Sequence, residues 1–104
     1  MKIGNYHFEL KNINYDESLS IECEHFNADL SVNGVKLAKC SNDGETFEYN
    51  TVEFYPQVTE FGHAVAAYLR SLPAMKFDWS DEELETNMSN IAQELLRKHL
   101  ERNE

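Results

Sequence analysis

Residues 26–44 read FNADLSVNGVKLAKCSNDG, and this stretch encodes a β-hairpin. Apolar and polar residues alternate on both sides of the central Asn33-Gly34 pair. A two-residue Asn-Gly connection is typical of a type I′ turn, because both residues need a positive φ, which Gly adopts freely and Asn at small cost. Asn42-Asp43-Gly44 then favours an exit turn with Asx hydrogen bonds. The stretch therefore predicts two antiparallel strands and the turn that ends them.

Upstream of the hairpin, the sequence keeps a period of two. Alternation from Tyr6 to Leu10 predicts a first strand, followed by a turn over residues 12–17. A second alternating run comprises Leu19, Ile21 and Cys23. It is out of phase with the apolar set that begins at Phe26, so we expect a bulge or bend at Glu24-His25.

A further strand is expected over residues 46–55, and its phase also changes part-way along. Phase breaks in two strands predict a strongly curved sheet. Beyond Pro56 the period becomes helical. A first helix is expected from Thr59 to Leu72, because Pro73 ends it.

A second helix is expected to begin at Ser80, which forms a capping box with Glu83, while Trp79 and Leu84 form a hydrophobic staple. One apolar stripe then continues along this helix through Leu84, Met88, Ile91 and Leu95.

The predicted fold is a single α+β domain over residues 1–104. Its first part, residues 1–56, is a four-stranded antiparallel meander, and residues 57–104 supply two helices that pack on one face of the sheet. No repeat or linker divides the chain.

The composition is strongly acidic, with 19 acids, 9 bases and a formal net charge of −10. This balance argues against direct binding of nucleic acid or of an anionic membrane, since both need a cationic surface. No stretch approaches the roughly 20 apolar residues of a membrane span, and the N-terminus does not resemble a signal peptide. We expect a cytoplasmic protein in which the two cysteines stay as free thiols.

A zinc site is one alternative. In the simple register of the Asn33-Gly34 turn, His25 and Cys40 share a sheet face within reach of each other, and Cys23 joins them if the strand has no bulge. His7 or Glu24 would be the fourth ligand. Zinc sites normally show close CxxC or HxxxH pairs, which this chain lacks, and a lone Cys in a strand is commonly a small buried apolar residue.

An enzyme is not predicted. The chain has no nucleophile elbow, phosphate-binding glycine loop or HExxH motif. His63, with Glu60 nearby, and His99 are expected on helical turns, where histidines are usually surface residues. A calcium loop at Asn42-Asp43-Gly44 would need further oxygen ligands at fixed offsets, and they are missing. We predict no catalytic, metal-binding or cofactor-binding residues.

The run ADLSVNGVKLAKCSNDG (residues 28–44) resembles a pattern in small, uncharacterised bacterial and phage-encoded proteins, in which a tight hairpin precedes Asn-Asp-Gly, often with Gly-Gly after it. Here Glu45-Thr46-Phe47 stands where those glycines would lie. The resemblance covers about a fifth of the chain and carries no assigned activity. It implies an accessory protein of phage or mobile-element type.

Two functions of different kinds follow. The first is a non-enzymatic interaction protein that meets a protein partner, or a second copy of itself as a homodimer, through a sheet face or edge. Its basis is that the twelve aromatic residues exceed what four short strands are expected to bury, and interfaces favour aromatics. Notable among them are Tyr6, Tyr15, Tyr49, Phe54, Tyr55 and Trp79. The second is a nucleic-acid mimic that inhibits a host DNA-processing protein, suggested by five acids within residues 78–85.

Overall fold

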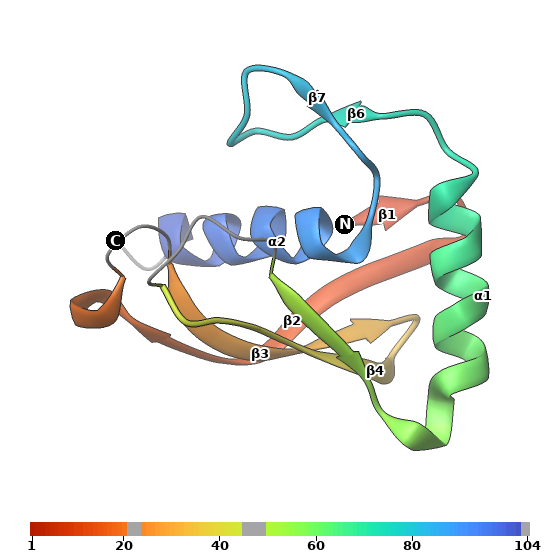
Figure 1. Ribbon diagram of the computed structural model, residues 1–104, viewed down its shortest axis with the longest axis horizontal. Helices are drawn as coiled ribbons and strands as arrows, with labels where there is room; N and C mark the ends of the chain where they lie inside the picture. The colour runs from red at the N-terminus through yellow and green to blue at the C-terminus, as the bar shows by residue number, and fades with distance from the viewer. Residues whose placement is uncertain (21–23, 45–49, 103–104) are drawn as a thin grey trace.

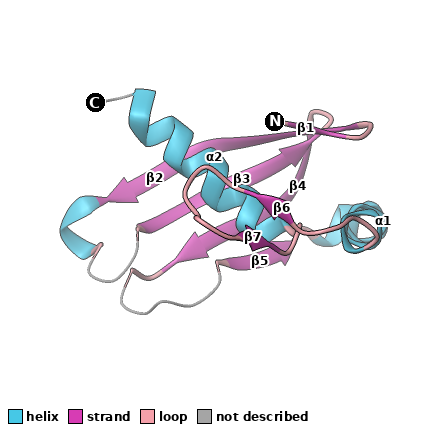
Figure 2. Cartoon of the chain, turned by 90° about the horizontal axis from the view of Figure 1, so that it is seen from above, coloured by secondary structure: helices cyan, strands magenta, loops and turns pink. Residues whose placement is uncertain are grey.

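The fold is α+β, with an antiparallel sheet of five strands and two helices (Figures 1 and 2). The structure is a computed structural model and describes residues 1–20, 24–44 and 50–102. In chain order, the elements are β1 (Lys2–Ile3), β2 (Tyr6–Asp16), the 3₁₀ turn η1 (Glu17–Leu19), β3 (His25–Val32), β4 (Val35–Asn42), β5 (Thr51–Phe54), the 3₁₀ turn η2 (Pro56–Val58), α1 (Thr59–Arg70), β6 (Met75–Lys76), β7 (Glu83–Leu84) and α2 (Met88–Arg102).

The sheet has the order β1-β2-β3-β4-β5, so sequential strands pair throughout. The predicted hairpin is confirmed as β3 and β4, with Asn33 at φ 51° and Gly34 at φ 80°. The exit turn is confirmed too, because the Gly44 N–H donates to Asn42 Oδ1 at 2.8 Å. Local turn chemistry therefore determines this central pair of strands.

The prediction of four strands in a strongly curved sheet is wrong. A fifth strand, β1, pairs with β2 through the turn at Gly4, and β2 continues through the residues where a turn was expected. A bulge between Lys11 and Asn14, with Asn12 at φ 53°, absorbs the irregularity there. The bend expected at Glu24-His25 falls at the start of β3, which begins at His25, so it does not interrupt a described strand.

Two parts of the predicted strands lie outside the described residues. Residues 21–23 belong to the expected alternating run, of which Leu19 is in η1 instead of a strand. Residues 45–49 contain the expected start of the last strand, whose described part is β5.

The core lies on one face of the sheet. Phe8, Leu30 and Cys40 are fully buried there, and α2 covers them with Ile91, Ala92 and Leu96. Seen from above, α2 crosses this face, whereas α1 stands at the end of the strands (Figure 2). Tyr68 of α1 there makes an edge-on contact with Tyr6 of β2, with ring centroids 5.3 Å apart.

The second helix begins later than predicted. Residues 81–87 are not helical; β6 and β7 instead pair as a two-stranded ribbon above α2 (Figure 1). Ser80 closes a local turn with Glu82, since its Oγ accepts from the Glu82 N–H at 3.2 Å and donates to the Glu82 carbonyl. The cap of α2 is Asn87, whose Oδ1 accepts from the Asn90 N–H at 2.8 Å. The predicted capping box at Ser80 is therefore wrong, and the helix begins about two turns further along the chain.

Candidate functional site

The residues singled out for zinc do not come together. A bulge between Leu30 and Ser31 shifts the hairpin register by one residue, so Cys40 lies opposite Ala28. Because neighbouring residues of a strand point to opposite faces, Cys40 faces the core and His25 faces away from it. Burial, together with the charge of Asp29, raises the pKa of the Cys40 thiol to about 12, which disfavours the thiolate that binds metal.

The other proposed ligands have different contacts. His7 lies 3.5 Å from Glu9 on the open sheet face, and Glu24 accepts from Gln93 and lies 3.2 Å from Arg97. Cys23 is outside the described residues. Within residues 1–20, 24–44 and 50–102, no three His, Cys, Asp or Glu side chains are grouped so that they could hold a metal ion.

The open face of the sheet, away from α2, is polar. At its centre, Asp29 accepts hydrogen bonds from the Tyr55 hydroxyl and from Asn12 Nδ2, and Lys36 Nζ lies 3.5 Å away. These partners hold the pKa of Asp29 below its usual range, and the hydrogen bond from Tyr55 raises the pKa of that phenol. Both shifts favour the pairing of a protonated tyrosine with an ionised aspartate, so charge-assisted hydrogen bonds hold this cluster together.

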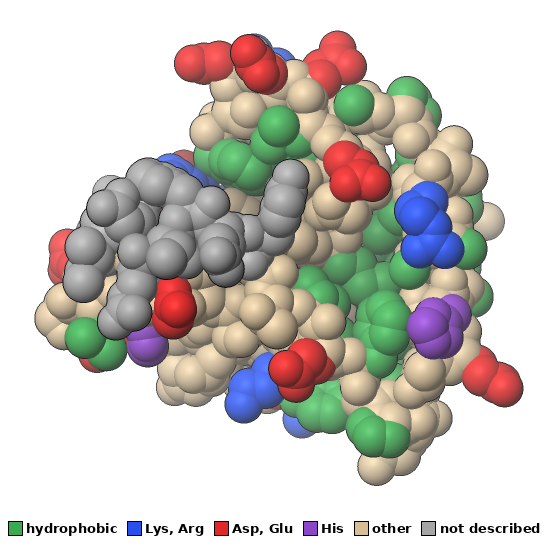
Figure 3. Space-filling model, viewed as in Figure 1, with side chains coloured by type: hydrophobic (Ala, Val, Ile, Leu, Met, Phe, Trp, Pro, Cys, Tyr) green, Lys and Arg blue, Asp and Glu red, His purple; other side chains and the backbone are tan. Residues whose placement is uncertain are grey.

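A groove with a volume of about 490 Å³ lies beside β5, on the core face of the sheet. Its walls come from β5, α1 and the first turn of α2, and Figure 3 shows it as a hollow in which apolar side chains gather. The volume is in the range of pockets that bind small molecules. Its lining residues are Asn50, Val52, Phe54, Ala66, Leu69, Arg70, Glu85, Thr86, Asn87, Met88 and Ser89.

The apolar wall of the groove is built from alternate residues of β5. Val52 and Phe54 pair with Cys40 and Ala38, which are both buried, so their side chains lie on the core face of the sheet. They are half-buried, because the groove leaves part of each side chain open. Close packing fixes Phe54, since a Cβ at Gly62 of α1 would come within 2.9 Å of its ring.

The main-chain groups of the same two residues point away from β4. The Tyr55 N–H donates to the Leu37 carbonyl at 2.9 Å, and antiparallel strands bond their neighbour at every second residue. Thr51 and Glu53 therefore bond β4, whereas the N–H and C=O groups of Val52 and Phe54 point to the free edge. The edge of β5 thus combines open hydrogen-bonding groups with apolar side chains.

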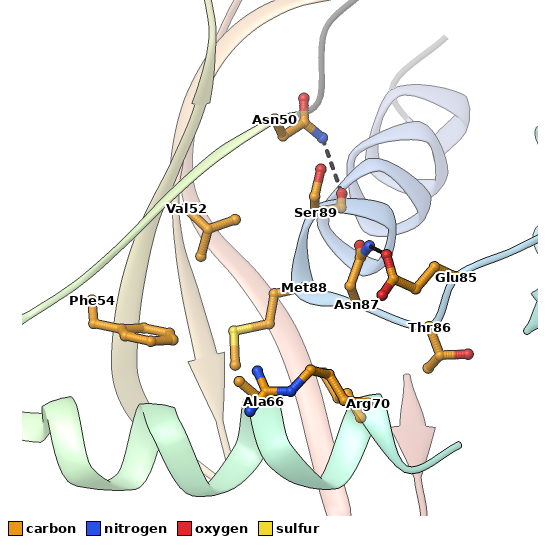
Figure 4. Close-up of a pocket in the computed structure, with 11 residues that line it drawn as sticks. Asn50, Val52, Phe54, Ala66, Arg70, Glu85, Thr86, Asn87, Met88 and Ser89 are labelled. Carbon is orange, nitrogen blue, oxygen red and sulfur yellow. Dashed lines mark hydrogen bonds between the residues drawn. The ribbon is translucent and has the colours of Figure 1, made fainter. Parts of the chain in front are cut away.

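The rim of the groove is polar. Asn50, buried at the start of β5, ties this strand to α2 by donating to the Ser89 carbonyl at 3.1 Å. Figure 4 shows Met88 between Phe54 and Asn87, and Arg70 extending from the end of α1 back toward Ala66. Across the described part of the chain, Arg70 forms no ion pair. The groove therefore has an apolar wall with a small number of polar groups around it, which is the usual composition of a binding site.

Phe54 was among the aromatic residues expected in excess, but the groove beside it was not predicted from the sequence. Its signal was the Val52/Phe54 alternation in the last strand of a meander, which must lie at an edge. The groove could not be foreseen because residues 85–87, which line it, were expected to be part of a helix.

Comparisons with protein-family models, with curated proteins and with solved structures found no match. No helix within the described ranges has the length and apolar character needed to cross a bilayer. Function is therefore inferred from the geometry of the groove and of the edge beside it.

Proposed function

We propose that this protein is a non-enzymatic interaction module that binds an extended segment of a partner protein along the edge of β5. The observation that carries this proposal is that Val52 and Phe54 offer free main-chain groups and groove-facing apolar side chains at the same edge. An added strand hydrogen-bonds the main chain, and its alternate side chains fill the groove.

The open sheet face is a poorer candidate for the docking surface than the groove. Acids and lysines alternate across it, and Asp29 is held by three neighbours. A surface of compensated charges offers little apolar area to bury, whereas the groove beside β5 is lined by Val52, Phe54 and Met88.

Nucleic-acid mimicry is supported less well. The acids of the β6–β7 ribbon gather at one end of the molecule in Figure 3, and they include Asp81, Glu82 and Glu83, all exposed. On the open sheet face, however, acids are interrupted by lysines. A mimic of a phosphate backbone needs an unbroken row of negative charge. Cytoplasmic location and a role as a phage-type accessory protein stay predictions.

The test is selection of peptides from a random displayed library on the immobilised protein, followed by titration of the enriched peptides. Val52→Pro removes the outward N–H without removing a bond to β4, so we expect binding to fall at least tenfold. Val52→Thr is the matched control, because it keeps both the N–H and the β-branched shape, and it should bind within about threefold of the parent.

Circular dichroism and urea unfolding of both variants show whether the fold is kept. Enriched peptides that bind Val52→Pro as tightly as the parent would contradict the proposal, as would a library that yields no binder.

A further inference from the structure

The open sheet face carries one row of charges that runs across four strands. Lys11 of β2 lies opposite Asp29 of β3, Asp29 lies opposite Lys39 of β4, and Lys39 lies opposite Glu53 of β5. The sign therefore alternates from strand to strand, which is favourable because directly opposite side chains of unlike charge attract.

This row ends at the free edge, on an acid. Glu53 is exposed, and it forms no ion pair within 4.0 Å among the residues that the structure describes. The whole chain has a net charge of −10, so its field also favours a cationic neighbour here. The next position of the row, on an added strand, is one where a cation fits.

We infer that the segment bound by β5 has the pattern apolar–Lys/Arg–apolar, with the cation opposite Glu53. This inference rests on the proposed function. The main-chain N–H and C=O of Glu53 bond Lys39 of β4, so they point away from an added strand. Glu53 and the residue opposite it on that strand therefore form a non-hydrogen-bonded pair, in which the Cα atoms are about 4.5 Å apart and the side chains are closest. The two flanking residues lie opposite Val52 and Phe54 and point into the groove.

The chain already uses such a segment at its other edge. Met1-Lys2-Ile3 pairs with β2 so that Lys2 lies opposite His7 on the open face. Met1 and Ile3 lie on the other side and pack against the core. An apolar–Lys–apolar strand therefore fits an edge of this sheet, with its cation on the open face and its apolar residues on the core face.

A second copy of the chain fits this edge less well. In a two-fold antiparallel pairing of β5 with itself, centred on Glu53, the two Glu53 carboxylates lie directly opposite each other, and such like-charged pairs are destabilising. The charge of −10 on each copy adds to the repulsion. The occupant we infer is thus a different protein, with a basic residue in an extended segment.

The experiment uses three hairpin peptides with an Asn-Gly turn, which preorganises the strand and so limits the ordering cost of binding. They differ only at the central position of the outer strand, which holds Lys, Gln or Glu between two valines. Each is titrated into the full chain and into Glu53→Lys, Glu53→Gln and Val52→Pro, and sedimentation reports the oligomeric state.

For the parent chain, we expect the Lys peptide to bind about tenfold more tightly than the Glu peptide, with the Gln peptide between them. Glu53→Lys should reverse this order and Glu53→Gln should remove it, and 1 M salt should reduce the preference. All binding should be weakened by Val52→Pro.

Equal binding of the three peptides, lost in Val52→Pro, would overturn the charge inference and leave the edge site intact. Failure of all three peptides to bind at millimolar concentration would overturn both proposals. A concentration-dependent dimer that Val52→Pro converts to a monomer would identify a second copy as the occupant and so overturn the inference.

Discussion

The two edges of the sheet differ in how they are closed. At the first edge, β1 covers the start of β2, and beyond it the bulge at Asn12, with Lys11 beside it, interrupts the ladder. Short strands, bulges and lysines are the features by which proteins keep edges from pairing with other chains. The edge of β5 is short, but it has no bulge, lysine or proline, and an apolar groove lies beside it. This difference between the two edges is the basis of our proposal that a partner strand binds at β5.

The largest expected effect tests which groups of β5 face outward. Glu53→Pro removes an N–H that bonds β4, so it should lower the free energy of unfolding by about 3 kcal/mol or more. Val52→Pro removes an outward N–H and should cost only about 1 kcal/mol, mainly through lost side-chain packing. Urea unfolding of both variants measures the difference. Equal losses would mean that the alternation along β5 is assigned wrongly.

The protected edge depends on Gly4, which turns β1 back onto β2 at φ 59°. A Cβ there would lie 2.0 Å from the Tyr68 hydroxyl oxygen. Gly4→Ala should therefore cost about 2 kcal/mol, from backbone strain and overlap together. In a Tyr68→Phe background the hydroxyl is gone, so the cost of Gly4→Ala should be smaller; an unchanged cost would show that strain alone is responsible.

The wall of the groove formed by residues 85–89 depends on the N-cap of α2. Asn87→Ala should lower the free energy of unfolding by about 1 kcal/mol, because the Asn90 N–H loses its acceptor. Ser80→Ala, which tests the capping box expected from the sequence, should change stability by less than about 0.5 kcal/mol. The reverse order in chemical denaturation would place the start of the helix at Ser80.

The smallest effect concerns the open face. Because the folded protein holds the pKa of Asp29 below its unfolded value, this carboxylate contributes stability above the unfolded pKa, and the contribution is lost as pH falls through the folded pKa. Tyr55→Phe removes the main cause of that shift, so its acid unfolding should depend less steeply on pH than that of the parent. Superimposable pH profiles of the two proteins below pH 5 would contradict this assignment.

Elements with a local cause could be predicted from the sequence. The hairpin of residues 26–44 follows from Asn33-Gly34, and α1 follows from its apolar period and the proline after it. The β6–β7 ribbon could not be predicted, because Ser80 and Glu83 satisfy the pattern of a capping box equally well in a turn. Contacts outside this motif help to hold the ribbon: the buried Thr86 hydroxyl donates to the Pro73 carbonyl at 2.8 Å, and Glu94 of α2 accepts from the Asp78 N–H at 3.1 Å.

The zinc site considered from the sequence is wrong for a similar reason. One extra residue at the bulge between Leu30 and Ser31 exchanges the two faces of β4 beyond it, which separates Cys40 from His25. Alternation alone does not locate such a bulge, because either register buries a plausible apolar set. The groove, in turn, needs β5, α1 and α2 to meet in space, although Val52 and Phe54 themselves were recognisable as alternating apolar residues.

Amide hydrogen exchange along β5 tests the central claim most directly. In the free protein, we expect the amides of Val52 and Phe54 to exchange much faster than those of Glu53 and Tyr55, which bond β4. Addition of the Lys hairpin peptide should slow exchange at Val52 and Phe54 alone within this strand. Slow exchange at these two amides in the free protein, or no change on adding a peptide that binds, would contradict an open edge at β5.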